Sequence, residues 1–408
     1  MATAPKVDTE TLSTFADASV AESFIAKAKG LRDLLRAEAP LGEKLRSPTP
    51  TVDKALNENG LLTMLLPKRL GGGGLSFTDF SRVQMEIAKG DPSISWVLQI
   101  VNGTSWVTSL SSDAIQDTIF GNGPAKVCGA YNPPGKAKKV DGGWIVNGAW
   151  PYTSGSRQSD WAQSGVVLEG YEGPVVPGIN MVYIPFSELE IVDSWYVTGM
   201  QGTGSDTSVA KDVFVPEHMM VMMDKPYGYV EPGKRHVGAP SDRVPVVPVV
   251  RATGIAQLIG AAEAMLELIE ADKNKPIVTT MYAKRADSGV FNHDIGRVAS
   301  QLNSARTLLF SVIGALDDVA VTGREFPFPE RAQQKAMCGQ VVELVHSAIE
   351  SIMFIAGSSA FSLDKPISRF WRDVHVGLRH IQNVPALGYE IYGRDRLGTQ
   401  NIAPPGAY

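Results

Sequence analysis

Cysteine is nearly absent from this chain, with Cys128 and Cys338 the only two among its 408 residues. Because the two lie far apart in the sequence, neither a disulfide framework nor a cysteine-based metal site is indicated, and we expect two reduced, buried thiols. HExxH, paired CxxC and EF-hand patterns are absent as well. The sequence therefore predicts a protein without a bound metal.

Long apolar runs and an excess of basic residues are also missing. The most apolar run, residues 244–250, is short and broken by prolines, whereas a helix that crosses a bilayer needs about 18 apolar residues. The net charge of −5 disfavours nucleic acid or an anionic membrane as the main partner. Residues 1–8 show no basic start before an apolar stretch, so we expect no signal peptide and a cytoplasmic protein.

The residue patterns that are present divide the chain into three zones. Residues 1–125 have mostly helical spacing, residues 126–237 contain short β-rich runs between Gly and Pro, and residues 238–408 return to the helical spacing of a bundle. We therefore predict an α+β fold: an N-terminal helical domain, a middle β-barrel or sandwich, and a C-terminal four-helix bundle.

Local signals refine this division. The run Val140–Gly148 predicts a strand, a turn and a second strand. The glycine run at 71–74 lacks the Lys-Ser/Thr of a phosphate-binding loop, so we interpret it as a flexible connection. In the last zone, helical spacing predicts helices over residues 251–272, 276–286, 292–321, 330–355 and 366–395.

Two segments carry candidate chemistry. His375 and His380, two of the six histidines, fall in the expected helical segment 368–380, and an imidazole can move a proton near neutral pH. The segment 148–156 holds Thr153 and Ser154 in a turn after a strand, where hydroxyl and backbone N–H groups can point outward. Taken alone, segment 368–380 also fits a helix with solvated charges and a packed imidazole. Segment 148–156 also fits an ordinary turn at the end of a strand.

Together, the motifs Trp150–Gly155 and Phe370–Asp373 and the helix–β–helix order resemble the acyl-CoA dehydrogenase fold. Within that fold the chain looks most like the flavin-dependent monooxygenases of two-component systems. The resemblance implies an oxygenase component that hydroxylates an aromatic or heteroaromatic, phenol- or indole-like substrate through a flavin C4a-hydroperoxide. It also implies reduced FMN or FAD as cofactor, molecular oxygen as co-substrate, and a homotetramer.

A separate NAD(P)H-dependent flavin reductase is expected as the partner that supplies reduced flavin. This chain has no Gly-x-Gly-x-x-Gly unit, so we do not expect it to bind NAD(P)H itself.

The resemblance also assigns residues to the flavin. Thr153 and Ser154 are expected to supply hydrogen-bond donors, and Trp150 or Trp195 an apolar wall against the ring. Arg285 resembles the arginine that grips the flavin phosphate, a role that suits a forked and permanently charged guanidinium. Asn132 stands in the loop where similar enzymes make flavin and substrate contacts. For Arg285 a plain surface charge is the alternative.

The chain departs from the dehydrogenases at the catalytic base. Those enzymes use a glutamate about nine residues after the Arg-Asp pair. Counting from Arg372-Asp373, the corresponding segment here is His380-Ile381-Gln382, without a carboxylate. Monooxygenases of this superfamily place a histidine there, so the resemblance favours oxygenation and makes His380 the candidate that takes a proton from the substrate.

Helical geometry separates the two histidines. Five residues at about 100° each place their side chains about 140° apart, so both cannot face one substrate unless the helix breaks. We rank His380 first and His375 second as catalytic residues. Walls that exclude water are expected from Trp96, Ile100, Trp106 and Phe361, and Asn102 is expected to hydrogen-bond the substrate. Each of these wall residues also fits plain core packing.

Three other functions stay open from the sequence. The chain could be an FAD-dependent acyl-CoA dehydrogenase or oxidase with a relocated base, or an N-oxygenase of the same fold. From a different class, it could be a non-catalytic helical assembly protein that has kept the fold.

Overall fold

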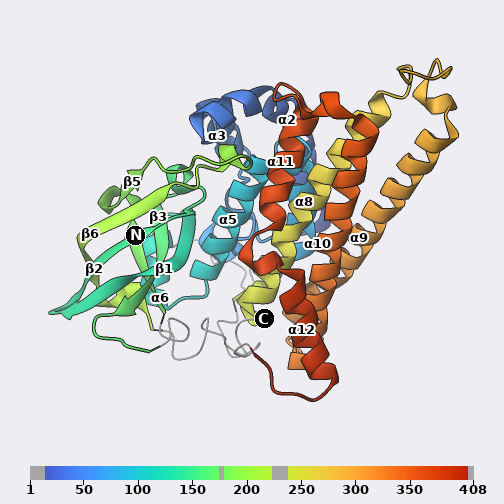
Figure 1. Ribbon diagram of the computed structural model, residues 1–408. Coiled ribbons are helices and arrows are strands. Elements are labelled where there is room, and N and C mark those ends of the chain that lie inside the picture. The colour runs from blue at the N-terminus through green and yellow to red at the C-terminus, as the bar shows by residue number, and fades with distance from the viewer. Residues whose placement is uncertain (1–13, 174–178, 223–237, 403–408) are drawn as a thin grey trace.

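The chain folds into a helical N-terminal part, a sheet and a helical C-terminal part, as predicted (Figure 1). The computed structural model describes residues 14–173, 179–222 and 238–402. The boundary predicted at residue 237 falls at the end of segment 223–237, outside the described residues. The first helices are α2 (Ala18–Leu45), α3 (Pro50–Glu58), α4 (Phe77–Ala88), α5 (Pro92–Thr108) and α6 (Asp113–Phe120).

Side-chain caps fix where several of these helices begin. The Ser76 hydroxyl accepts a hydrogen bond from Asp79 N at the start of α4, and the Asp91 carboxyl accepts one from Ser93 N at the start of α5. Such caps satisfy backbone N–H groups that have no partner inside the helix. Pro92 follows as the first residue of α5, a position where a missing N–H costs nothing.

The middle of the chain forms one mixed, seven-stranded sheet in the order β5-β6-β2-β1-β3-β4-β7. All neighbouring strands are antiparallel except β1 and β3, which are parallel. The strands are β1 (Val127–Val140), β2 (Gly143–Trp150), β3 (Trp161–Leu168), β4 (Asn180–Pro185), β5 (Glu190–Val192), β6 (Thr207–Pro216) and β7 (Met220–Val221).

The predicted hairpin is confirmed. β1 and β2 pair through Val140 and Gly143, and the turn between them uses Gly142 with φ +73°. A positive φ of this kind is common in tight hairpin turns and is accessible to glycine without steric cost. The strand after this turn delivers the chain to the segment 150–156.

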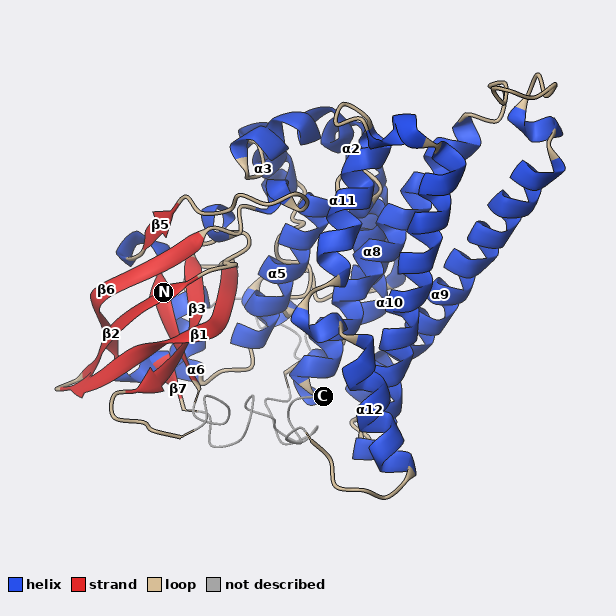
Figure 2. Cartoon of the chain, in the orientation of Figure 1, coloured by secondary structure: helices blue, strands red, loops and turns tan. Residues whose placement is uncertain are grey.

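The C-terminal part is a bundle in which α8 is central. It packs against α4, α9, α10 and α11, and is buried along almost its whole length. The bundle helices are α8 (Val246–Ala271), α9 (Gly289–Thr322), α10 (Phe328–Ala356), α11 (Pro366–Leu378) and α12 (Pro385–Arg396). Figure 2 shows the sheet on one side, the bundle on the other, and α5 between them.

Three sequence predictions for this part were wrong. Residues 276–286 form turns rather than a helix. This segment is largely exposed and has no core to pack an apolar face against. The helix predicted from residue 251 begins at Val246, because Pro248 lies in the first turn, where its missing N–H is tolerated. The helix predicted over 366–395 is two helices, interrupted at residues 379–384 ahead of Pro385.

Two helices are longer and more apolar than the sequence prediction allowed. By length and hydropathy, α8 and α10 both reach the range of a membrane-crossing helix. In α8, 83% of the most apolar window is buried inside the protein, as expected for the core helix of a bundle. In α10 the share is 50%.

Candidate active site

The loop that follows β2 is held tightly against α5. Gly155 has φ +74°, and a Cβ there would lie 3.0 Å from Cγ2 of Val101. Tyr152 also has a left-handed backbone, with φ +63°, and its side chain is 68% exposed. A non-glycine residue in this conformation carries strain, which is concentrated at functional sites. The loop thus turns Tyr152 outward and places Ser154 beside the helix.

Trp96, Ser154 and His380 meet here from three distant parts of the chain. The indole Nε1 of Trp96 donates a hydrogen bond to Ser154 Oγ at 3.2 Å. The Trp96 ring packs edge-on against the His380 imidazole, with centroids 5.2 Å apart. α5 is mostly buried, and Trp96 and Ile100 lie on its partly exposed face. These contacts define the Trp96–Ser154–His380 site.

His380 is available to accept a proton in this site. It lies in the break between α11 and α12, where its Nδ1 accepts a hydrogen bond from Gln382 N at 3.4 Å. That length indicates a weak bond, so the Nδ1 lone pair is only lightly engaged. Burial lowers the pKa of His380, which keeps the ring neutral at pH 7. A neutral imidazole with a lightly held lone pair is suited to act as a general base.

A chain of hydroxyl groups continues from Ser154 into the loop 200–205. Ser154 Oγ lies 2.6 Å from Ser205 Oγ, which lies 2.6 Å from Thr203 Oγ1. Thr203 donates to the Met200 carbonyl, and Trp96 at the other end is only a donor. The two ends therefore fix one direction: each hydroxyl accepts from the Trp96 side and donates toward Met200. A bound ligand can redirect the Ser154 proton to itself.

These residues fit a flavin ring. Such a ring needs an apolar surface and a hydrogen-bond donor at its edge. The exposed ring of Tyr152 packs edge-on against Trp195, with centroids 5.6 Å apart, and Ser154 lies two residues from Tyr152. Tyr152 and Trp195 offer apolar rings, and Ser154 offers a hydroxyl whose proton can be redirected, so the residues of this region include both kinds of group.

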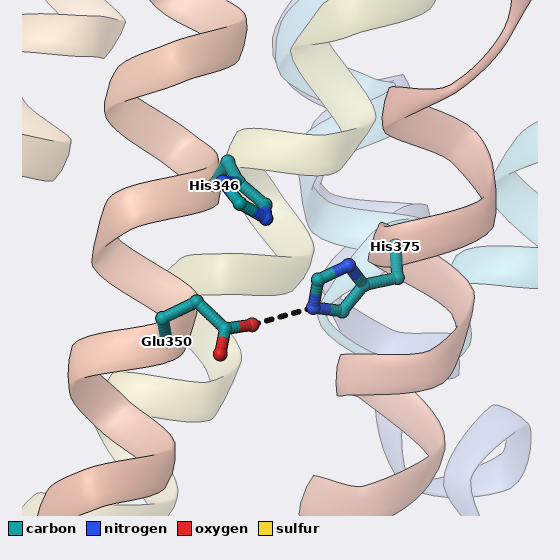
Figure 3. A group of neighbouring side chains, drawn as sticks. All are labelled: His346, Glu350 and His375. Carbon is teal, nitrogen blue, oxygen red and sulfur yellow. Dashed lines mark hydrogen bonds and ion pairs between the residues drawn. The ribbon is translucent and has the colours of Figure 1, made fainter.

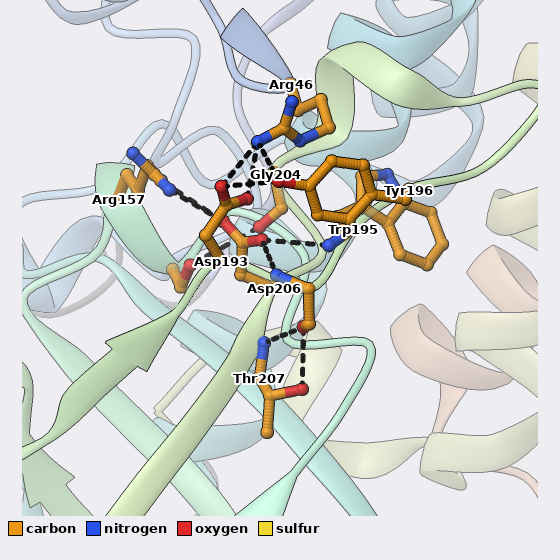
Figure 4. Close-up of polar contacts among 10 residues, drawn as sticks. Arg46, Arg157, Asp193, Trp195, Tyr196, Gly204, Asp206 and Thr207 are labelled. Atoms are coloured by element: carbon orange, nitrogen blue, oxygen red, sulfur yellow. Dashed lines mark hydrogen bonds and ion pairs between the residues drawn. The ribbon is translucent and has the colours of Figure 1, made fainter.

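Asp206 holds the loops that carry these residues (Figure 4). Its carboxylate is fully buried and accepts hydrogen bonds from Ser194 N and Trp195 N. Arg157 donates to the same carboxylate at 2.8 Å, and the Asp206 carbonyl accepts from Thr153 N. One residue thus fixes both the Trp195 loop and the Ser154 loop.

A second buried carboxyl joins α11 to the same region. Asp373 accepts hydrogen bonds from Met200 N and from the Ser93 hydroxyl at the start of α5. Burial, reinforced by the nearby Asp91, raises the pKa of Asp373 to about 7. The Arg-Asp motif of the sequence therefore works as a structural link between α5, α11 and the loop 200–205.

His375 lies in a different cluster, between α10 and α11 (Figure 3). Its Nε2 is 2.6 Å from a carboxylate oxygen of Glu350, and the His346 ring is 5.2 Å away. Glu350 also accepts from Trp371, and Arg379 donates to His375 Nδ1. The pKa of His375 is lowered, because burial outweighs the effect of Glu350.

His346, Glu350 and His375 stand close enough to hold a metal ion, a possibility that the sequence analysis missed. The hydrogen bonds favour another state. Because Arg379 can only donate, His375 Nδ1 must accept, so the proton of the neutral ring lies on Nε2 and faces Glu350. To bind a metal through Nε2, His375 must lose the proton on that nitrogen. A neutral ring then carries its proton on Nδ1, so that two donors, Nδ1–H and the Arg379 N–H, face each other. Glu350 and His375 each have hydrogen-bond partners within this cluster.

Two predicted flavin contacts are buried elsewhere. Trp150, expected as a possible wall, is fully buried in the sheet core, where its Nε1 donates to Gly165 O. The Thr153 hydroxyl donates to Trp150 O and pairs with Ser208, and its N–H donates to Asp206 O. The side chains of both residues therefore face the sheet and not the Trp96–Ser154–His380 site. Trp195 remains a candidate, with 8% exposure beside Tyr152.

Two predicted substrate contacts are also core residues. The Asn102 side chain is fully buried and bonds to the backbone of Leu61, Leu65 and Leu98. These bonds use both amide protons and the oxygen, which leaves no free donor for a substrate. Trp106 is fully buried and packs edge-on against Phe77 at 5.4 Å. Neither is positioned to contact a substrate.

The structure does not bring three further candidates to the Trp96–Ser154–His380 site. Phe361 packs on Trp371, in the cluster of His375, with centroids 5.3 Å apart. Arg285 lies in the loop between α8 and α9, which Figure 1 shows at the end of the bundle remote from the sheet. Asn132 is exposed on β1, within the irregular stretch where the pairing with β3 shifts register.

Sequence reasoning missed Tyr152, Thr203 and Ser205. Tyr152 was part of the quoted motif, but its left-handed backbone and exposure cannot be read from residue type, because aromatic residues rarely adopt that conformation. Thr203 and Ser205 stand in a Gly-rich stretch that resembles any polar turn. Their role depends on contact with a loop about 50 residues earlier, which a single sequence does not reveal.

Comparison with known proteins agrees with this arrangement. Residues 28–119 match the family "Acyl-CoA dehydrogenase, N-terminal domain" and residues 252–385 match "Acyl-CoA dehydrogenase, C-terminal domain". The oxygenase subunit HsaA of a flavin-dependent monooxygenase from Mycobacterium tuberculosis is 30% identical, over 95% of this chain and 97% of its own length. The oxygenase component of an FADH2-dependent resorcinol hydroxylase from Rhizobium sp. is 26% identical, over 94% and 96%.

Solved structures give the same result. XiaF from Streptomyces sp., in complex with FADH2 and glycerol, superposes with a TM-score of 0.86 at 26% identity, over 95% of this chain and 98% of XiaF. HsaA from M. tuberculosis superposes with a TM-score of 0.84 at 29% identity, over 94% and 99%. The resemblance inferred from the sequence is confirmed: this chain belongs to the oxygenase components of flavin-dependent monooxygenases with the acyl-CoA dehydrogenase fold, which work with reduced flavin and molecular oxygen.

Proposed function

We propose that this chain hydroxylates a small phenol- or indole-like compound at the Trp96–Ser154–His380 site. Reduced flavin, supplied by a separate reductase, provides two electrons for oxygen, so that one oxygen atom enters the ring and the other leaves as water. His380 takes the proton of the substrate hydroxyl or ring N–H and makes the ring electron-rich. Trp96 forms a wall for the substrate, and Ser154 offers its proton to the flavin.

The contact between Trp96, His380 and Ser154 carries this proposal. It brings a neutral base and a hydroxyl group into contact with one indole. Among the described residues, the hydrogen-bond partners of these three side chains include no carboxylate that would correspond to the glutamate of a dehydrogenase. The proposal therefore favours oxygenation over removal of an α-proton. The alternative function, oxygenation of a nitrogen atom, is distinguished by whether the product carries the new oxygen on nitrogen or on a ring carbon.

Paired histidine variants test the role of His380. His380→Ala is expected to bind flavin normally and to lose hydroxylation of an aromatic panel. His375→Ala is the matched control, because it removes an imidazole from the same segment but outside the site, and we expect it to retain product formation. Unchanged product yield in His380→Ala would show that another group acts as the base.

The proposal extends to assembly and location. We propose a cytoplasmic homotetramer, supported by exposed apolar side chains around Arg285 at the remote end of the bundle: Val278, Met281, Tyr282 and Val290. In such an assembly Arg285 would reach a flavin phosphate held by a neighbouring subunit rather than by its own chain. Light scattering of the purified protein is expected to give four chains, and a monomer would overturn this part of the proposal.

A further inference from the structure

The bundle contains two buried cations that have no carboxylate beside them among the described residues. Arg251 of α8 is 2% exposed, and neither Nη1 nor Nη2 has a hydrogen-bond partner in the part of the chain that the structure describes. Lys335 of α10 is 7% exposed and close enough for the Arg251 charge to lower its pKa. Burial is the main cause of the lowered pKa of both groups. The one acidic group that acts on them among the described residues is the Cys338 thiol, and burial raises its own pKa, which favours the neutral thiol over an anion.

Such an arrangement is costly without a ligand. An unpaired charge in a protein interior costs several kcal/mol relative to water. Burial, with the Arg251 charge, brings the pKa of Lys335 down to about 8, a sign that the charged form is held at a disadvantage. Groups perturbed in this way cluster at binding and catalytic sites. An acidic group placed between the two side chains would offset the cost of both.

Helix geometry places this pair next to the active site. Arg251 is seven residues before Leu258 in α8. Seven residues correspond to a rotation of about 700° about the helix axis and a rise of about 10 Å, so both side chains lie on nearly the same face of the helix. Leu258 faces α11, because a Cβ on Gly377 would lie 2.6 Å from its Cδ2. α11 runs opposite to α8, so the chain beyond Gly377 continues toward the level of Arg251 (Figure 1).

His380 lies in that continuation. The turn that follows it, Ile381–Asn383, contacts both α8 and α10. On the other side, α12 packs against α10 at Lys335, where a Cβ on Gly388 would lie 2.8 Å from Lys335 O. Arg251 and Lys335 therefore flank the segment between His380 and α12, on the bundle side of His380.

We propose that Arg251 and Lys335 form an anion-binding subsite that receives a carboxylate or similar acidic group of the aromatic substrate, with the ring beside Trp96 and His380. This deepens the proposed function by naming the substrate class as aromatic acids. The guanidinium can bind a carboxylate through two parallel hydrogen bonds, and the Lys335 ammonium adds a point charge.

Binding without turnover tests the subsite. Indole-3-acetate and 4-hydroxyphenylacetate are each compared with the corresponding amide, which keeps the shape and removes the charge. Quenching of tryptophan fluorescence at pH 7 measures affinity in the absence of flavin. We expect at least one acid to bind about tenfold or more tightly than its amide, as for a hydrogen-bonded charge pair. We expect Arg251→Met to abolish the preference for the acid and Lys335→Met to reduce it. Arg306→Met is the matched control, because Arg306 is a bundle arginine that pairs with Glu263 outside the subsite, and we expect this variant to retain the preference.

The remaining outcomes are equally decisive. If no acid is favoured over its amide, or if Arg251→Met keeps the preference, the subsite is wrong. If sulfate raises the melting temperature of the wild type while acids and amides bind equally, the pair holds a free anion and the substrate assignment fails. A structural role for Arg251 predicts a lower melting temperature for Arg251→Met, whereas an unpaired buried charge predicts one that is unchanged or higher. Hydroxylation of neutral phenols by the same preparation tests the proposed function separately.

Discussion

Substituting Asp206 tests whether one buried carboxylate holds the two loops of the active site. Its Oδ1 accepts from Ser194 N at 3.0 Å and Trp195 N at 3.1 Å, and its Oδ2 accepts from Arg157 at 2.8 Å. Asp206→Ala leaves the buried Trp195 N–H and the partly buried Ser194 N–H without this partner, which costs about 1–3 kcal/mol for the buried group and less for the other, and it removes the ion pair. We expect a loss of about 3–5 kcal/mol in the free energy of unfolding.

Asp206→Asn separates these contributions. The amide oxygen still accepts the two backbone N–H groups, but the NH2 group faces the Arg157 donor. The Arg157 side chain is 43% exposed and keeps part of its hydration, so we expect a smaller loss of about 1–2 kcal/mol. Asp193→Ala is the matched control, since Asp193 pairs with Arg46 in the same region but is half-exposed.

Urea denaturation and flavin titration of the three variants provide the assay. The expected order of destabilisation is Asp206→Ala, then Asp206→Asn, then Asp193→Ala, with flavin affinity falling in the same order. Equal stability of Asp206→Ala and Asp193→Ala would refute the reasoning, because it would mean that the buried hydrogen bonds do not hold the loops.

Two further predictions follow from the backbone and from buried charge. Gly155→Ala forces alanine into φ +74° against Val101, so we expect a loss of about 1–2 kcal/mol in unfolding free energy and weaker flavin binding; a change below about 0.5 kcal/mol would contradict the contact. The folded-state pKa of Asp373 is raised from 3.8 to about 7, so the wild type loses stability as the pH rises through that range. Asp373→Asn cannot ionise and still accepts a hydrogen bond from Met200 N. Its stability relative to the wild type should therefore rise from about pH 4 to pH 7 in denaturation curves, and a gain that does not depend on pH would show that Asp373 is not titrating.

The order of elements was predictable because it depends on local chemistry. The Gly142 turn and the caps of α4 and α5 are fixed by neighbouring residues. The segment 276–286 has helical spacing but is largely exposed among the described residues of this chain, and only the tertiary structure reveals that. The break between α11 and α12 was missed although Pro385 signals it, because apolar spacing continues across it.

Candidate site residues could be predicted where the residue type has a distinctive chemistry. They could not be predicted where the role depends on the direction in which the side chain points. His380 and Ser154 were predicted from two motifs as a base and a hydroxyl donor, and the structure brings both side chains to Trp96. Trp150 and Thr153 belong to the same motif but face the sheet, since the loop rotates at Tyr152. Arg251 and Lys335 gave no sequence signal, because their significance is burial without a carboxylate partner among the residues that the structure describes.

Oxygen transfer from isotopically labelled dioxygen tests the central claim most directly. The purified chain is supplied with chemically reduced FMN or FADH2 and a panel of phenols, indoles and their acids, and the products are analysed by mass spectrometry. We predict that the wild type adds one labelled oxygen atom to an aromatic ring and that His380→Ala, with flavin bound, adds none. Flavin reduction by an acyl-CoA, or a panel in which no product carries labelled oxygen, would contradict the account.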